Sequence, residues 1–214
     1  MPLLFSRQLN EHTILGTWSI TERTEALLLA LPAGISPELM LQQAHPRRQK
    51  EWLASRALVY SLLQQFTPDT PVLQRTIHGR PVFEQAPYFV SISHSPGLAA
   101  VIVSDKYEVG IDVELLSPKA LRVANKFLNE DEKNYTCGEE AKTCLYWSAK
   151  ETLYKMYSQR KLIFIENLLL QPETENSLLG RVQTDNFSKL YQVHHELLPQ
   201  HVLTYCIDNS TNEL

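Results

Sequence analysis

A long segment between Arg48 and Phe66 contains neither glycine nor proline. Its apolar side chains recur every three or four positions, which predicts a helix with a buried stripe made of Leu53, Ala57, Tyr60 and Leu63. The first half of the segment also carries a cationic edge, because Arg48, Trp52 and Arg56 follow one another at intervals of four. A solvated helix face and an anion-binding face would both produce that edge.

Two predicted strands follow this helix. Residues 88–92 alternate in character and residues 98–104 are almost continuously apolar, and the polar segment SHSPG between them predicts a turn. Before these strands, Gly79 and Pro81 mark another turn, which presents Arg80. The first half of the chain therefore combines one long helix with a hairpin.

A further strand is predicted in the segment VGIDVELL, residues 109–116. Its odd positions are apolar, and its even positions are Gly110, Asp112 and Glu114. With a period of two, the two carboxylates share one face, and their α-carbons lie about 6.7 Å apart. Two ionised carboxylates at that spacing repel by about 2 to 3 kcal/mol at an effective dielectric constant near 20. Either the face is solvated or a cation sits on it, and oxygen ligands alone favour magnesium.

A second long helix is predicted in CLYWSAKETLYKMYSQ, residues 144–159. Helical spacing gives an apolar stripe expected to pack on the core: Leu145, Ala149, Thr152, Leu153 and Met156. The opposite arc, expected to face solvent, holds Trp147, Ser148, Glu151 and Lys155. An ordinary ion pair would explain Glu151 and Lys155, but it would not explain Trp147 or Lys150. A third carboxylate flanked by two lysines would suit a metal site that clamps a polyphosphate.

Composition limits the classes of protein to which such a site can belong. A chain of 214 residues that is 43% hydrophobic can bury a full core as one domain or as two halves. No apolar run is long enough for a membrane span, and a cytoplasmic location is the default. The net charge of −4 gives no general reason to expect nucleic acid or an anionic membrane as a partner. No glycine-rich phosphate loop occurs, so side chains must hold any phosphates.

The ordered segments HGRP, SISHS, VGIDVE, FLNEDE and WSAKETLYK resemble the Sfp-type 4′-phosphopantetheinyl transferases, from His78 to Lys155. The signature of that family is a GKP-like turn, an SHS turn, a GIDxE strand and a WxxKEAxxK helix. The resemblance implies an α+β fold with a pseudo-two-fold pair of similar halves, each a small antiparallel sheet packed on a long helix, with the active site in the cleft between them. We expect residues 1–107 to form a half that binds coenzyme A. Residues 108–214 would carry the metal-binding strand and the WSAKE helix.

The resemblance also implies roles for individual residues. Mg²⁺ would be held by Asp112, Glu114 and Glu151. The residues implied to contact coenzyme A are Arg48, Lys50, Arg80, Ser93, His94, Lys150 and Lys155. Arg47 and Arg56 compete with Arg48 and Lys50 for the 3′-phosphate, and that choice stays open.

The reaction implied by the resemblance moves the 4′-phosphopantetheine group of coenzyme A onto a serine of an apo acyl or peptidyl carrier protein and releases 3′,5′-ADP. Glu151, Lys155 and Asp112 are the expected catalytic residues. Glu151 would accept the serine proton, directly or through a metal-bound water. Trp147 is expected to pack against the other half near the cleft.

The expected partners are coenzyme A and a carrier protein, with no nucleic acid and no membrane, and the chain is expected to be a monomer. Two alternatives stay open. The first is a coenzyme A or nucleotide binding module without transferase activity. The second is a metal-binding or structural protein that uses His194, His195 and His201, although their spacing matches no zinc motif and the apolar residues around them suggest plain strands.

Overall fold

The computed structural model describes residues 3–159 and 161–209. Its internal contacts divide the chain into two compact units, Met1–Tyr107 and Glu108–Leu214. Each unit contains an antiparallel sheet and a long helix of 18 residues. The predicted α+β class with two similar halves is therefore confirmed.

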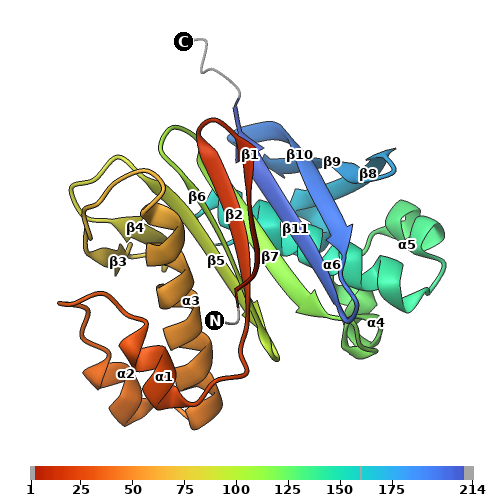
Figure 1. Ribbon diagram of the computed structural model, residues 1–214. Helices are drawn as coiled ribbons and strands as arrows, with labels where there is room; N and C mark the ends of the chain where they lie inside the picture. The colour runs from red at the N-terminus through yellow and green to blue at the C-terminus, as the bar shows by residue number, and fades with distance from the viewer. Residues whose placement is uncertain (1–2, 160, 210–214) are drawn as a thin grey trace. The chain divides into compact units, whose positions relative to one another are not determined.

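The sheet of the first unit has the strand order β1-β2-β6-β5 (Figure 1). Its strands are β1 (Leu3–Asn10), β2 (Thr13–Ser19), β5 (Phe89–Ser95) and β6 (Leu98–Ser104). The predicted long helix is α3 (Pro46–Leu63), which packs on β6, β2 and β5. Two short helices, α1 (Thr24–Leu29) and α2 (Glu38–Gln43), contact α3. The predicted stripe of α3 is buried, with Leu53 and Leu63 fully enclosed.

The two predicted turns of the first unit differ in outcome. The turn that presents Arg80 is confirmed, because it joins β3 (Leu73–Arg75) to β4 (Pro81–Phe83). The turn predicted at SHSPG is shorter than expected. Strand β5 continues to Ser95, which pairs with Leu98, and the chain reverses through Pro96 and a glycine with positive φ. Ser93 and His94 are therefore strand residues.

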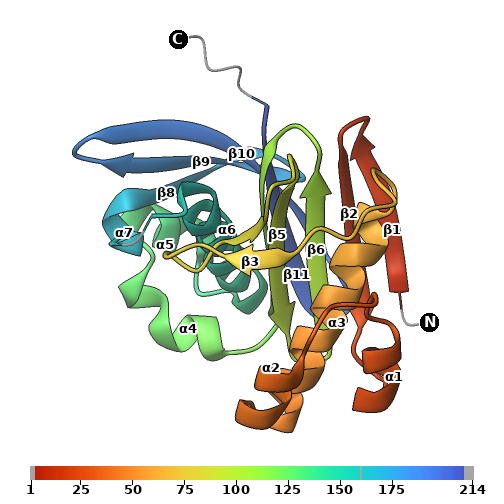
Figure 2. The same ribbon diagram turned by 90° about the vertical axis from the view of Figure 1, so that its left-hand side faces the viewer.

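The sheet of the second unit has the order β7-β11-β10-β9-β8, and Figure 2 shows the long β9–β10 hairpin of this sheet. Its strands are β7 (Glu108–Leu115), β8 (Leu168–Thr174), β9 (Ser177–Thr184), β10 (Phe187–Leu197) and β11 (His201–Asp208). The helical segments are α4 (Lys119–Val123), the 3₁₀ turn η1 (Ala124–Lys126), α5 (Glu130–Thr136), α6 (Glu140–Tyr157) and α7 (Phe164–Asn167). None of the helices in the described part of the chain is long and apolar enough to cross a bilayer.

Helix α6 packs against β7 and β11, and its predicted apolar stripe is buried. A glycine on β7 permits this close approach. A Cβ atom added to Gly110 would lie 2.8 Å from Met156 Sδ and 3.1 Å from the carbonyl oxygen of Thr152. The even-numbered face of β7 therefore lies directly against α6, and Asp112 and Glu114 follow Gly110 on that face.

Candidate active site

Asp112 is held by two side chains of α6. Ser148 Oγ donates to Asp112 Oδ2 over 2.9 Å, and Lys155 Nζ donates to Asp112 Oδ1 over 2.9 Å. Asp112 is only 4% exposed, and Ser148 is fully buried. The expectation that the polar arc of this helix faces solvent is therefore wrong for Ser148, because that arc lies along the polar face of β7.

Glu114 and Glu151 extend this polar group. Trp147 Nε1 donates to Glu114 Oε1 over 2.9 Å. Burial raises the pKa of Glu114, and the neighbouring Asp112 carboxylate raises it further. Burial likewise raises the pKa of Glu151 to about 7, with a second contribution from Asp112, while Lys155 opposes the shift. The three carboxylates therefore lie close enough to disfavour one another's ionised form.

The chemistry of this set fits a hard divalent cation. It offers carboxylate oxygens only, without sulfur or imidazole, and partial burial leaves its mutual repulsion incompletely screened. Within residues 3–159 and 161–209, however, no group of three potential ligands is already drawn together in a coordination geometry. Hydrogen bonds from Lys155, Ser148 and Trp147 occupy carboxylate oxygens instead.

Lys150 does not lie with these groups, although the family resemblance implied that it contacts the pyrophosphate of coenzyme A. Its side chain is fully buried, and Nζ lies 2.7 Å from Glu132 Oε2. The same atom donates to the carbonyl oxygens of Phe127 and Phe164. A buried ammonium with three acceptors has no donor left for a phosphate. The assignment of Lys150 to coenzyme A is therefore wrong.

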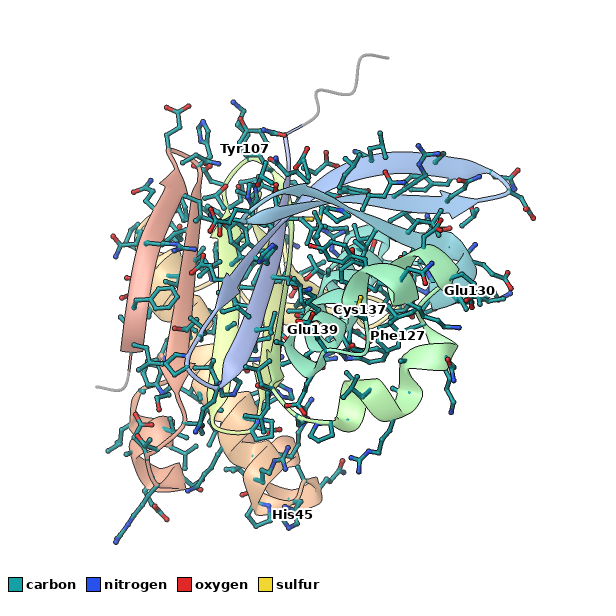
Figure 3. The ribbon with its side chains drawn as sticks, turned by 90° about the vertical axis from the view of Figure 1, so that its right-hand side faces the viewer. His45, Tyr107, Phe127, Glu130, Cys137 and Glu139 are labelled. Carbon is teal, nitrogen blue, oxygen red and sulfur yellow. The ribbon has the colours of Figure 1, made fainter. Side chains whose placement is uncertain are left out.

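Trp147 finds its aromatic partners inside the second unit. Its ring is stacked on Phe164 with a centroid distance of 5.7 Å and meets Phe127 edge-on at 5.1 Å. Figure 3 labels Phe127, which lies just before α5; Glu130 begins that helix and Cys137 caps its end. The prediction placed Trp147 against the other half, whereas these contacts and its hydrogen bond to Glu114 all lie within residues 108–214.

In the first unit, several charged side chains lie around Glu51 near the N-terminal end of α3. Figure 3 labels His45, which caps this helix by accepting a hydrogen bond from Arg47 N. Glu51 is 6% exposed and accepts a 2.8 Å hydrogen bond from Arg47 Nε. His94 Nδ1 lies 3.4 Å from Glu51 Oε2, and Arg48 contacts the His94 ring through Nη1. Arg48 and His94, two of the residues assigned to coenzyme A, are thus brought together.

Arg56, which the sequence left open as a contact for the 3′-phosphate, is a buried cation. It is only 6% exposed, and its guanidinium lies 4.9 Å from the ring centroid of Trp52. Burial lowers its pKa, the charges of Arg75 and Arg48 act in the same direction, and the resulting value is about 10. A buried arginine with the charges of two further arginines near it favours an anion as a partner. The spacing of four residues between Arg48, Trp52 and Arg56 was the sequence pattern that could have predicted this cationic group.

The other predicted contacts are less closely grouped. Ser93 is buried on β5, Lys50 is partly exposed on α3, and Arg80 ends the β3–β4 turn, where its backbone N–H donates to Thr76 Oγ1. His194 and His195 lie in β10 and His201 lies in β11, as the strand interpretation of that segment predicts. Burial lowers the pKa of His194 and of His195. Among the described residues, these histidines form no metal-binding group.

Comparison with known proteins gives matches in both units. Residues 36–104 match the profile of the 4′-phosphopantetheinyl transferase N-terminal domain, and residues 108–206 match the 4′-phosphopantetheinyl transferase superfamily. The 4′-phosphopantetheinyl transferase AcpT of Salmonella typhimurium is 34% identical over 91 residues, which cover 42% of this chain and 45% of that protein. AcpT of Escherichia coli K12 is 34% identical over 89 residues, or 41% and 44% of the two chains. The chain thus spans less than half the length of these curated relatives.

Proposed function

We propose that this chain, which belongs to the 4′-phosphopantetheinyl transferase superfamily, transfers the 4′-phosphopantetheine group of coenzyme A to a serine of an apo acyl or peptidyl carrier protein, with Mg²⁺ as its metal ion. The observation that carries this proposal is the grouping of Asp112, Glu114 and Glu151 on β7 and α6, with Lys155 in contact with the first of them. Two relatives that carry the name of this activity add support.

The three carboxylates are the residues that would hold Mg²⁺. When bound, the ion neutralises charge on the pyrophosphate oxygens of coenzyme A. Lys155 supplies a fixed positive charge beside the same oxygens, because its Nζ is anchored by Asp112 and by the carbonyl oxygen of Ile111. That anchoring fixes the ammonium before the substrate arrives, so little reorganisation is needed during the reaction.

The chemical step exchanges one phosphorus–oxygen bond for another. The serine hydroxyl of the carrier protein attacks the β-phosphorus of coenzyme A, and the bond to the bridging oxygen breaks. The electron pair of that bond leaves with 3′,5′-ADP, and the serine proton passes to a carboxylate, for which Glu151 is our candidate. No covalent intermediate with the protein is required, so orientation and charge stabilisation supply the acceleration.

The 3′-phosphate of coenzyme A is assigned to the arginine group of the first unit. Arg48 and Arg56 are the preferred contacts, since Arg48 adds to the positive charge around the buried Arg56 and an anion would offset that charge. His94 lies beside Arg48 and would add a further donor. Lys50, Arg80 and Ser93 stay candidate contacts.

The test is direct. The protein is incubated with coenzyme A, Mg²⁺ and an apo carrier protein, and the mass of the carrier is measured. The wild-type protein and Glu166→Gln, a change at an exposed residue of α7, should both add one phosphopantetheine group, whereas Glu151→Gln should add it far more slowly. Coenzyme A binding without any mass change would instead favour the binding module. Failure of both would overturn the proposal.

A further inference from the structure

Lys150 and Glu132 form a buried ion pair that the proposed reaction does not use. Glu132 is 1% exposed and Lys150 is fully enclosed. Glu132 also accepts hydrogen bonds from two backbone N–H groups, those of Asn129 and Leu170, each over 2.9 Å. The pair therefore joins α6 to the start of α5 and to β8.

The remaining bonds of Lys150 reach the backbone of two aromatic residues. Its Nζ lies 2.5 Å from the carbonyl oxygen of Phe127 and 3.2 Å from that of Phe164. The rings of these two residues are the ones that contact Trp147, one edge-on and one stacked. Lys150 thus holds the backbone of both residues that fix the Trp147 indole.

The indole is in turn bonded to the carboxylate group of β7. Trp147 Nε1 donates to Glu114 Oε1, and Trp147 lies one residue before Ser148, which donates to Asp112. Because an indole has a single N–H donor, the orientation of the ring decides where the Glu114 carboxylate is held. A contiguous set of contacts therefore runs from the buried ion pair through Phe127 and Phe164 to Trp147 and Glu114.

Stability alone gives a weak reason for such a pair. A buried ion pair is often no more stabilising than apolar side chains of the same size, because both charges must lose their water. Well-packed apolar groups would fill the site but would not hold two carbonyl oxygens and two N–H groups in fixed positions. The benefit of the pair is geometric.

We infer that Lys150 and Glu132 are positioning residues, which hold the Trp147 indole and through it set the Glu114 carboxylate. Their link to catalysis rests on the proposed function, in which Glu114 helps to hold Mg²⁺. Partners that orient metal ligands typically change metal affinity or activity by about 10- to 100-fold when they are removed. A loss of that size is expected here.

The experiment changes both charges together, since a single change would leave the other charge buried and unpaired. Lys150→Met with Glu132→Gln is compared with wild type by two-dimensional NMR of the tryptophan indole N–H groups, without Mg²⁺. The chain has three tryptophans, and Trp147→Phe identifies the Trp147 signal. In wild type this proton should exchange slowly with water, and its signal should move in Glu114→Gln. In the paired variant it should lose that protection and no longer respond to Glu114→Gln.

A matched control lies at the N-terminal end of the same helix. Lys142 and Glu139 form a partly exposed pair with a 2.8 Å bond, and Lys142→Met with Glu139→Gln removes equivalent charges. The aromatic contact of Lys142 is with Tyr135, whereas the rings that contact Trp147 are those of Phe127 and Phe164. This control should leave the Trp147 signal and the Mg²⁺ requirement unchanged. If the paired variant at Lys150 fails to fold, Phe164→Leu removes the ring stacked on Trp147 while the ion pair remains, and the same loss of protection is expected.

The indole N–H signal of Trp147 tests the positioning role of Lys150 and Glu132 without any measurement of phosphopantetheine transfer. A folded paired variant whose Trp147 signal keeps its protection and its response to Glu114→Gln would overturn it, and so would Phe164→Leu with an unchanged signal. If the wild-type protein transfers no phosphopantetheine group, the proposed function fails. The NMR experiment would still show whether Lys150 and Glu132 position the Trp147 indole. If the wild type transfers, the paired variant should also need about 10- to 100-fold more Mg²⁺ for half-maximal rate.

Discussion

Lys155 Nζ lies 2.9 Å from Asp112 Oδ1 and 2.8 Å from the carbonyl oxygen of Ile111, so one ammonium group joins α6 to two successive residues of β7. Ser148 holds the second oxygen of the same carboxylate. Asp112 is therefore both a part of the buried packing and a candidate metal ligand.

This double role predicts two separate effects of Asp112→Asn. Without Mg²⁺ the protein should lose about 1 to 3 kcal/mol of unfolding free energy, because a neutral amide weakens the bond from Lys155 and mismatches the donor on Ser148. Transfer should fall further than the folded fraction. Urea unfolding and carrier modification measure the two effects, with Asp131→Asn on the exposed side of α5 as the control. Activity that simply follows the folded fraction would remove Asp112 from the metal site.

The raised pKa of Glu151 predicts a pH dependence of stability in the metal-free protein. Its pKa is about 7 in the folded state and near 4.5 in its ordinary state, so the folded protein binds this proton more tightly. The resulting stabilisation is complete below the ordinary pKa and is lost as the pH rises toward about 7. Glu151→Gln should therefore gain melting temperature relative to wild type between pH 5 and about pH 7. The melting temperatures are measured against pH, with Glu166→Gln as the reference variant. Curves that run parallel for wild type and Glu151→Gln would contradict the predicted pH dependence.

Gly110→Ala should push α6 away from β7. The new Cβ would lie 2.8 Å from Met156 Sδ and 3.1 Å from the carbonyl oxygen of Thr152. The flexible sulfur can move but the backbone cannot, so a cost of about 1 to 3 kcal/mol is expected. Denaturant unfolding measures this loss of unfolding free energy. Gly110→Ala should cost less in a Met156→Ala background than in the wild-type protein, but some cost should remain because the Thr152 carbonyl oxygen is still in the way. An unfolding free energy that is unchanged in Gly110→Ala would mean that α6 and β7 are not in close contact.

Arg56→Met tests the anion site of the first unit. Methionine keeps an apolar chain beside Trp52 but removes a buried charge that Arg75 and Arg48 repel. The unfolding free energy without ligand should hold or rise, whereas the preference for coenzyme A over dephospho-coenzyme A should disappear. Calorimetry with both ligands provides the measurement. A variant that keeps the wild-type preference would assign the 3′-phosphate elsewhere.

Patterns within single elements were predictable from the sequence. The two-residue period of VGIDVEL identified β7, and helical spacing identified the buried stripe of α6. Local periodicity also gave the grouping of Asp112 with Glu114. These features depend on backbone geometry, which repeats along an element.

Partners from distant segments were not predictable in the same way. Lys150 adjoins Glu151 in sequence, but neighbouring helical residues point about 100° apart, and its partner Glu132 lies 18 positions earlier. The same limit applies to Ser148, whose burial depends on Asp112 in β7. The extent of β5 was missed because two residues suffice for the reversal when one is a glycine with positive φ.

The central claim is that the carboxylates of β7 and α6 bind the ion on which transfer depends, and a magnesium titration of the transfer rate in wild type and Glu114→Gln tests it most directly. The variant loses one charged ligand while its amide can still accept the bond from Trp147. Its half-maximal rate should require more Mg²⁺ than wild type, while Glu166→Gln should match wild type. A Glu114→Gln curve that coincides with the wild-type curve, or a wild-type rate that does not depend on added Mg²⁺ after chelation, would contradict the claim.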